Sequence, residues 1–244
     1  MERSSARCSD EGKDMDKAVF SDWDKTLTRV YSSHEFMQHC ADRKLIDRKY
    51  AELIRHTTLR MKAGKISYLK SLAWFKKAIA GFVGVDYAQA RMEADAFAAE
   101  FYEEGSLYGF VPSLVREARD RGYEVVVVTG SLGFLARALG ERAGIKEVIG
   151  TQEIVEAGRI AGFDETVLSV DGKAKAVKAW AQLHNMELRR CIGIGDTLHD
   201  AGFMGACGKA IAFDPDVELR KVAERRKWAI AGEESILTAL NAYL

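Results

Sequence analysis

Two carboxylates and a lysine follow a short apolar run near the start of the chain, in the sequence AVFSDWDKTLT at residues 18–28. If residues 18–20 form a buried strand, Asp22 and Asp24 stand side by side at its carboxyl end, where their charges repel and raise the pKa of at least one of them. A solvated loop is the alternative for this stretch alone, so the rest of the chain must decide.

Polar residues also follow two other predicted strands. Thr129, Gly130 and Ser131 follow the run YEVVVV, and Asp196 and Asp200 follow CIGIG. Because the carboxyl ends of parallel strands meet at one edge of a sheet, we expect all these side chains to gather in one place. Either run would be a weak signal by itself, and their joint placement is the strong one.

A lysine supplies the cation that this acidic group lacks. Lys173 follows Gly172 at the start of a predicted helix, where a phosphate could meet both the ammonium and the free N–H groups of the helix. A solvent-facing lysine is the alternative, because Lys175 and Lys178 lie nearby.

The elements that must position these residues alternate between strand and helix. β-branched apolar runs predict strands at residues 18–20, 123–130, 190–196, 209–214 and 227–232. Amphipathic patterns predict helices between them, including 112–122 and 173–185. This alternation predicts an α/β fold with a parallel sheet covered by helices on both faces.

One long segment breaks the alternation. Residues 33–104 contain helical patterns and no convincing strand, so we expect an inserted helical unit that hangs over the carboxyl edge of the sheet like a lid. Most of its aromatic side chains are expected to pack between helices. Residues 149–162 alternate weakly and predict a β-hairpin with Gly158 in its turn.

Composition limits the classes of function. The 244 residues are 48% hydrophobic, enough for a sizeable core, and 36 basic residues balance 36 acidic ones. No overall field therefore favours nucleic acid or an anionic membrane, although the balance does not exclude a local basic patch. No apolar run approaches the ~20 residues of a membrane-spanning helix. Residues 1–17 read as a mobile tail without a signal peptide, so we expect a cytoplasmic location.

Four motifs in order resemble those of the haloacid dehalogenase-like phosphohydrolases, in particular the phosphoserine-phosphatase-like branch. They are DWDKT from Asp22, VVVVTGS with Thr129, the isolated Lys173, and GDTLHD from Asp196 to Asp200. The resemblance covers residues 18–232 and implies a Rossmann-like core with an α-helical cap. The implied parts are a core at 18–32 and 105–244, the cap at 33–104 and the tail at 1–17.

The resemblance also implies a role for each motif residue. Asp22 is expected to attack phosphorus and become an aspartyl-phosphate, and Asp24 to act as general acid and then general base. One Asp22 oxygen, the Asp24 carbonyl and Asp196 would hold Mg²⁺, with Asp200 as an inner or outer carboxylate.

Three further residues, Thr129, Gly130 and Lys173, would bind the remaining phosphoryl oxygens. The expected activity is Mg²⁺-dependent hydrolysis of a small-molecule phosphate ester by a monomer or homodimer, with no nucleic-acid or membrane partner. A phosphotransferase or phosphomutase is the close alternative. A non-catalytic phospho-switch is a remote one, because Asp24 favours attack by water.

The chain departs from phosphoserine phosphatases where they read the substrate. Tyr31 replaces the glutamate that reads the ammonium of serine, and Phe75, or Lys76 after a one-residue slip, replaces the cap arginine that reads its carboxylate. We therefore expect Tyr31, together with Trp74 or Phe75, to select a less charged or more apolar ester. Lys25 stands where many relatives carry a small residue, and is interpreted as a solvent-facing lysine or a substrate contact.

Overall fold

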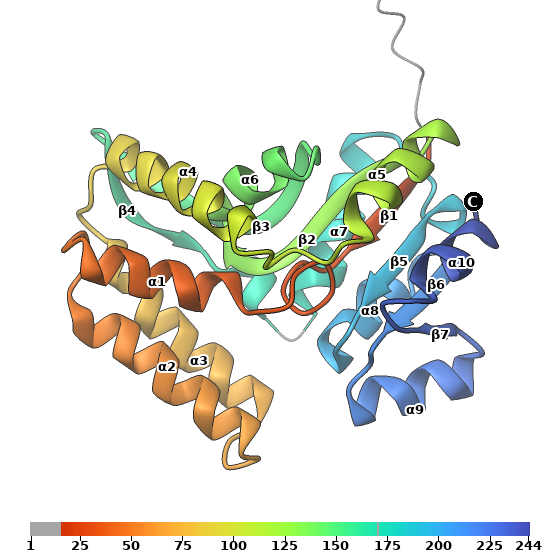
Figure 1. Cartoon of the computed structure of the whole chain (residues 1–244), viewed down its shortest axis with the longest axis horizontal. Coiled ribbons are helices and arrows are strands. Elements are labelled where there is room, and N and C mark those ends of the chain that lie inside the picture. Colours follow the sequence, from red (N-terminus) through yellow and green to blue (C-terminus); the bar gives the residue numbers. More distant parts are fainter. Residues whose placement is uncertain (1–15, 170) are drawn as a thin grey trace, which may run out of the picture.

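A computed structural model describes residues 16–169 and 171–244, so that nearly all of the predicted tail lies outside the described residues. Seven strands form one sheet in the order β4-β3-β2-β1-β5-β6-β7 (Figure 1). The strands are β1 Ala18–Ser21, β2 Glu124–Leu132, β3 Glu147–Glu156, β4 Arg159–Asp164, β5 Ile192–Gly195, β6 Lys209–Phe213 and β7 Ala229–Ala231.

Every neighbouring pair in the sheet is parallel except β3 and β4. The first strand lies at the centre, between β2 and β5, so the residues after it are surrounded by other strand ends. The register of β2 against β3 shifts between Val128 and Leu132. Thr129, Gly130 and Ser131 therefore lie within an irregular part of β2 rather than after its end, because the strand is longer than its apolar run.

Helices cover both faces of the sheet, as predicted. Val125 and Val127 pack on one face with α5, α6 and α10, whereas Val126 and Val128 pack on the other with α7, α8 and α9. This alternation follows from the two-residue period of a strand. The helices on the two faces are α5 Val111–Asp120, α6 Gly133–Arg142 and α10 Ile236–Asn241, and α7 Gly172–Leu183, α8 Ala201–Met204 and α9 Val217–Arg226.

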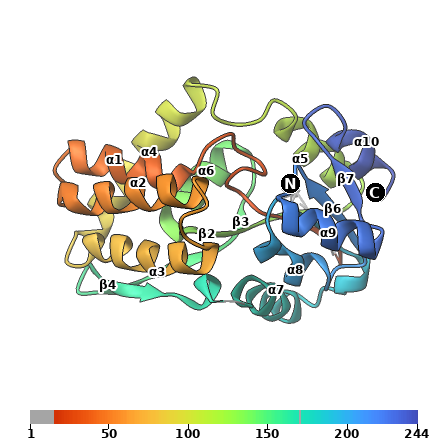
Figure 2. The same cartoon turned by 90° about the horizontal axis from the view of Figure 1, so that it is seen from below.

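Five α-helices lie between β1 and β2, and four of them precede α5. These four are α1 Ser32–Asp42, α2 Arg48–Lys62, α3 Tyr68–Ile79 and α4 Tyr87–Glu103. Helices α2 and α3 pack side by side as a hairpin against α1, on one side of the molecule in Figure 2, with α7–α9 on the other. The fourth helix packs against α6 instead, so only α1–α3 have the position expected of a lid. The cap boundaries at 33 and 104 stay a prediction.

The predicted hairpin is present as β3 and β4. Its two turn residues, Ala157 and Gly158, have φ angles of 48° and 78°, as a two-residue primed turn requires. Hydrogen bonds attach the hairpin to the chain that leads into α4: the Gly84 N–H donates to the Ile160 carbonyl at 2.8 Å, and the Ile160 N–H donates to the Val85 carbonyl at 2.9 Å. The hairpin therefore braces the helical insertion against the sheet.

Short 3-10 turns complete the fold at Ala80–Phe82, Thr166–Leu168, Leu188–Arg190 and Leu198–Asp200. Within residues 16–169 and 171–244, none of the helices has the length and apolar content needed to cross a membrane.

Candidate active site

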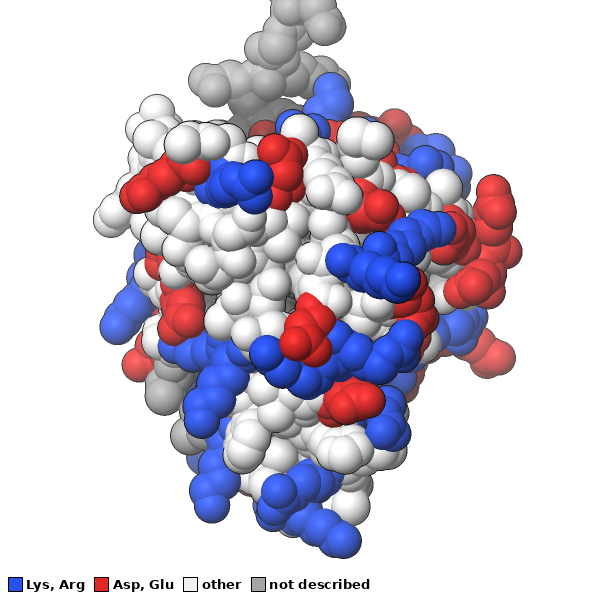
Figure 3. Space-filling model, turned by 90° about the vertical axis from the view of Figure 1, so that its left-hand side faces the viewer, with Lys and Arg blue, Asp and Glu red and all other residues white. Residues whose placement is uncertain are grey.

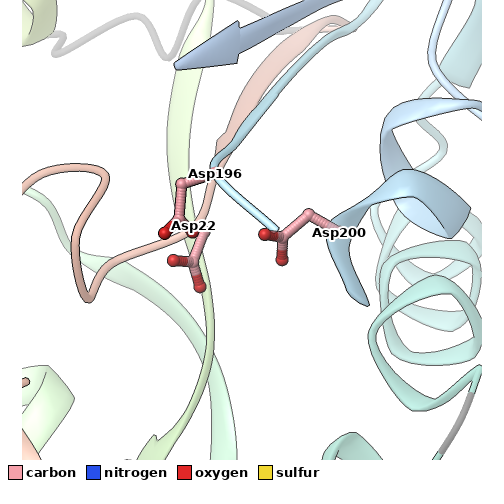
Figure 4. Close-up of side chains that lie close together, drawn as sticks. All are labelled: Asp22, Asp196 and Asp200. Carbon is pink, nitrogen blue, oxygen red and sulfur yellow. The ribbon is translucent and has the colours of Figure 1, made fainter. Parts of the chain in front are cut away.

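Three carboxylates meet at the carboxyl edge of the central strands (Figure 4). Asp22 follows β1, Asp196 follows β5, and Asp200 lies in the 3-10 turn just beyond. One carboxylate oxygen from each lies within 4.8 Å of the others, so all three can reach a single ion. Because all three donors are oxygens, the set suits a hard cation such as Mg²⁺.

A buried ammonium lies among these carboxylates. Lys173 Nζ donates to Asp22 Oδ1, and to Asp200 Oδ1 at 2.7 Å. The alternative of a solvent-facing Lys173 is therefore wrong. Gly172 allows α7 to begin at this place, because a Cβ at residue 172 would lie 2.0 Å from the carbonyl oxygen of Thr166. The first turn of α7 thus approaches the chain more closely than any side chain would allow.

Burial dominates the electrostatics of the carboxylates. It raises the pKa of Asp22 to about 7, with Lys173 opposing the shift and Asp200 adding to it. Burial also raises the pKa of Asp196 well above its usual range, and repulsion from Asp22 and Asp200 adds to this effect. A divalent cation at this site would favour the ionised carboxylates. It would therefore lower the pKa values of Asp22 and Asp196 again.

Asp24 is attached to the first turn of α1. Its Oδ1 accepts hydrogen bonds from the Ser32 N–H at 2.7 Å and the Ser32 hydroxyl at 2.6 Å. The pKa of Asp24 is raised, as the sequence predicts, but the cause is burial of the carboxyl, which the bonds from Ser32 oppose. Repulsion from Asp24 adds a minor part to the raised pKa of Asp22, whereas burial accounts for the rise at Asp24.

A capping box fixes Asp200. Its Oδ2 accepts from both the N–H and the hydroxyl of Thr197, each at 3.0 Å, while its Oδ1 faces Lys173. Gly195 lets this side chain approach β5, because a Cβ at residue 195 would lie 2.5 Å from Asp200 Cβ. The local turn therefore fixes Oδ2 of Asp200, and Lys173 of α7 binds Oδ1.

Thr129 and Gly130 lie beside this cluster, in the irregular part of β2. Thr129 Oγ1 accepts from the Ser131 N–H at 3.0 Å, and the Ser131 hydroxyl contacts that of Ser33 at the start of α1. Both Thr129 and Gly130 line the same cavity as Asp22. Of the residues expected to bind phosphate, Lys173 is the one with direct contacts to the carboxylates.

The cavity above the cluster has a volume of about 470 Å³. Its floor is formed by the strand-end residues, and its roof by α1, α2 and α3, with Leu168 at one side. The roof residues carry apolar side chains, hydroxyl groups and one imidazole: Tyr31, Ser33, His34, Ile54, Thr57, Thr58, Met61, Ser71, Leu72 and Phe75. Among the side chains that the structure describes, the helical insertion thus covers the site without adding a lysine, arginine, aspartate or glutamate to its lining.

Two of the three residues expected to select the substrate reach the cavity. Tyr31 and Phe75 line it, whereas Trp74 lies on the outer surface of α3 and lines a separate groove. Neighbouring helical residues are about 100° apart, so α3 can present only one of Phe75 and Trp74 to the site. Lys76, the alternative to Phe75, pairs with Glu165 at 2.9 Å and does not line the cavity.

The position of Lys25 leaves the choice between a solvent-facing lysine and a substrate contact a prediction. The residue lines the cavity, but its ammonium donates to the Arg29 carbonyl at 2.8 Å. Its φ angle of 71° lies in the left-handed region, which favours glycine.

Several polar residues of the site were not expected. The Thr26 hydroxyl lies 3.3 Å from Asp22 Oδ2 and 3.4 Å from Asp196 Oδ1, and so bridges two strand ends. Asp214 and Asp216 line the cavity mouth. Asp214 directly follows β6, so the strand-end signal that identifies Asp22 and Asp196 could have found it.

A search with family models matches residues 19–205 to the haloacid dehalogenase-like hydrolases. The chain belongs to this family. The resemblance predicted from the four motifs is thereby confirmed, and so is the hydrolase class. A phosphoserine phosphatase of Mycobacterium tuberculosis is 29% identical over 227 residues, covering 89% of this haloacid dehalogenase-like chain and 71% of the relative.

Solved structures of haloacid dehalogenase-like proteins share the fold. A protein of unknown function from Bordetella pertussis Tohama I has a TM-score of 0.71 and 20% identity, covering 89% of this chain and 98% of that one. A substrate-bound phosphoserine phosphatase has a TM-score of 0.65 and 19% identity, and the match covers 93% of this chain and 98% of that one. The predicted α/β sheet with an added helical unit is therefore a recurring architecture.

Proposed function

We propose that this chain is an Mg²⁺-dependent phosphatase that hydrolyses a small-molecule phosphomonoester through an aspartyl-phosphate on Asp22. The observation that carries the proposal is the contact of the Lys173 ammonium with Asp22 and Asp200 at the floor of an enclosed cavity. A phosphoryl group placed there would meet a nucleophile, a cation and the donors of β2 together. The Mycobacterium tuberculosis relative, which is named a phosphoserine phosphatase, supports the same class of reaction.

In the first half of the reaction, Asp22 attacks phosphorus while Lys173, Thr129 and the Gly130 N–H bind the non-bridging oxygens. The bond from phosphorus to the ester oxygen breaks, and its electron pair leaves with that oxygen. Asp24 donates a proton to the leaving oxygen, a task that suits a carboxyl whose pKa burial raises.

In the second half, water replaces the leaving alcohol. Asp24, now ionised, takes a proton from water as the water oxygen attacks phosphorus. The bond from phosphorus to Asp22 breaks, which releases inorganic phosphate and restores both carboxyl groups. Asp22, Asp196 and Asp200 would hold Mg²⁺, which when bound neutralises charge on the carboxylates and the phosphoryl group.

A screen for phosphate release tests this proposal. The wild type is incubated with a panel of phosphomonoesters in Mg²⁺, in excess chelator and in Ca²⁺, with Asp22→Asn as the matched control. We expect release in Mg²⁺ alone, because Ca²⁺ accepts bidentate carboxylates and would engage both oxygens of Asp22. Full activity in chelator would contradict the metal assignment, and phosphoryl transfer to added alcohols in preference to water would favour a phosphotransferase.

The roof of the cavity supports a substrate with an uncharged leaving group. Of the roof side chains that the structure describes, none that lines the cavity is a lysine, arginine, aspartate or glutamate, so the charges of serine would lose water without gaining one of these partners there. We therefore expect alkyl, aryl or sugar phosphates to be preferred.

This preference is measured as kcat/KM for L-phosphoserine against uncharged phosphate esters. We expect phosphoserine to be the poorer substrate by at least ~10-fold, the effect of one unmatched polar contact of about 1.4 kcal/mol. A clear preference for phosphoserine would contradict the interpretation of Tyr31 and Phe75 while leaving the hydrolytic mechanism intact.

A further inference from the structure

The hairpin formed by α2 and α3 concentrates positive charge. Residues 48–79 contain nine of the 36 basic side chains of the chain and one of its 36 acidic ones. The remainder therefore has 27 basic against 35 acidic side chains. A chain of zero net charge thus places a net charge of +8 on two helices and their connection.

Most of these cations are not neutralised by the protein itself. Three of the nine are in ion pairs, Arg48 with Asp42, Lys49 with Asp47 and Lys76 with Glu165. Five others are exposed and form no ion pair among residues 16–169 and 171–244: Arg55, Arg60, Lys65, Lys70 and Lys77. Unpaired exposed cations are available to a polyanionic surface.

Exposed apolar side chains lie among the cations. Leu59 of α2 is 54% exposed and Trp74 of α3 is 38% exposed. A groove of about 200 Å³ lies on the surface of the hairpin, and Leu53, Ile66 and Trp74 line it together with Arg60. Lys77 lies over the Trp74 ring, with its Nζ 5.1 Å from the centroid.

These residues share one outer face of the hairpin. The exposed positions of α2 include 52, 55, 56, 59 and 60, and those of α3 include 70, 73, 74 and 77, which is the spacing of a single helical stripe in each case. Figure 3 shows this side of the molecule, where blue side chains surround white ones in the lower part and red is sparse.

We propose that the outer face of the α2–α3 hairpin binds the surface of an anionic lipid bilayer. Lysine and arginine side chains contribute binding free energy beside anionic headgroups. Trp74, Leu59 and Ile66 can enter the boundary between the headgroups and the acyl chains. A nucleic acid would satisfy the cations but offers no apolar layer for Leu59 and Ile66. The expectation that no membrane partner exists rests on the net charge of the whole chain, which conceals this patch.

The site remains accessible when this face is occupied. Ile54, Met61 and Leu72 of the same helices line the catalytic cavity on their inner side, and Thr57 lies between the cavity and the outer groove. Binding to a bilayer would therefore hold the cavity close to the lipid surface without filling it. The proposal does not depend on the chemistry at Asp22.

Sedimentation with vesicles tests the proposal. The full chain is mixed with vesicles of phosphatidylcholine alone or with added phosphatidylglycerol, at increasing salt. We expect binding only to the anionic vesicles and release by salt. The triple variant Arg60→Glu, Lys70→Glu, Lys77→Glu should bind at least roughly 100-fold more weakly, since each cation near the surface contributes about five-fold.

A matched variant controls for net charge. Arg116→Glu, Lys178→Glu and Arg225→Glu change the same number of exposed cations on α5, α7 and α9, and should bind as the wild type does. Both triple variants should keep the circular dichroism spectrum and hydrolysis of a soluble ester. Equal loss in both variants, no binding to anionic vesicles, or retention of duplex DNA at a salt concentration that releases the vesicles would overturn the assignment.

Discussion

At the scale of single residues, the site is a balance between buried carboxylates and one ammonium. Asp22, Asp196 and Asp200 each bring a negative charge into a place with little water, and Lys173 offsets part of that cost. The pKa of Asp22 stays raised despite this contact, so the cluster still favours additional positive charge. A site of this kind binds cations and protons in competition.

The division of labour between two carboxyl groups can be tested directly. Asp22→Asn should abolish both turnover and covalent labelling, because the amide cannot attack phosphorus. Asp24→Asn should keep some labelling but slow phosphate release by ~10²- to 10⁴-fold, the usual contribution of a general acid or base. Labelling is followed with a radioactive or fluorogenic phosphate ester under rapid quench, and release of phosphate by Asp22→Asn at the wild-type rate would rule out the mechanism.

Lys25 provides a test of backbone conformation. A left-handed φ angle costs a residue with a Cβ about 1–2 kcal/mol, and valine more, whereas glycine adopts it freely. Lys25→Gly should therefore stay within about 1 kcal/mol of the wild-type free energy of unfolding, and Lys25→Val should lose about 2 kcal/mol. Lys25→Met isolates the ammonium bond to Arg29, and equal stability of the Val and Gly variants in urea would refute the argument.

Sequence reasoning finds the residues that follow regular strands and misses those that depend on side-chain direction. Asp22 and Asp196 are evident because apolar runs end just before them. Asp214 also follows a strand, and Asp216 stands two residues after it as Asp24 does after Asp22, so the same signal was available there. The choice between Trp74 and Phe75 depends on how α3 is rotated, which packing against α2 decides and the sequence does not encode locally.

At the scale of elements, close approaches of the backbone place the side chains of the candidate active site. Gly172 allows the first turn of α7 to lie against the turn at Thr166–Leu168, and Gly195 allows Asp200 to approach β5. Both glycines stand directly before or near a motif residue. The geometry of the site thus depends on the backbone at these two glycines as well as on the side chains.

Substitution at Gly172 should therefore move Lys173. In Gly172→Ala the new Cβ would overlap the Thr166 carbonyl, so the start of α7 must shift, at a cost of about 1–3 kcal/mol of stability. We expect a higher KM as well as a lower free energy of unfolding, because Lys173 would lose its position. Gly162→Ala is the control, since its Cβ meets no atom within 4 Å, and matching effects of the two substitutions would contradict this account.

The strands and the hairpin are predictable because their patterns are local, whereas some helices are not. The sequence VELRKVAERR of α9 is mainly polar, and Leu219 and Ala223 are its buried residues, so no strong amphipathic pattern reveals it. The packing of α4 against α6 is also not encoded in either helix alone. This packing depends on the path of the chain from the helical insertion through α4 and back to β2.

At the scale of the whole molecule, the stability of the metal-free protein should depend on pH through Asp22. The folded protein keeps a proton on Asp22 up to a pKa of about 7, whereas the unfolded chain loses it near 3.8. Between these values the folded state binds more protons, so this group's contribution to stability falls as pH rises. A metal must displace that proton, and its binding should therefore tighten as pH rises.

This linkage predicts a larger Mg²⁺-induced rise in Tm at a pH above 7 than near pH 5. Thermal unfolding is measured over a series of Mg²⁺ concentrations at each pH, at constant ionic strength. The Asp22→Asn variant has no proton to displace at that position and should show a weaker effect of pH on the Mg²⁺-induced shift. An Mg²⁺ shift that is larger at the lower pH would contradict the assignment of Asp22 as a ligand.

The attachment of Asp24 to α1 has a consequence for the timing of catalysis. Ser32 donates two hydrogen bonds to the Asp24 carboxylate, and these bonds favour its ionised form. By the reciprocity of linked equilibria, protonation of Asp24 weakens the hold of the catalytic loop on the first turn of α1. In the mechanism that we propose, loss of the Asp24 proton to the leaving alcohol would therefore strengthen the attachment of this loop to α1, and recovery of a proton from water would weaken it.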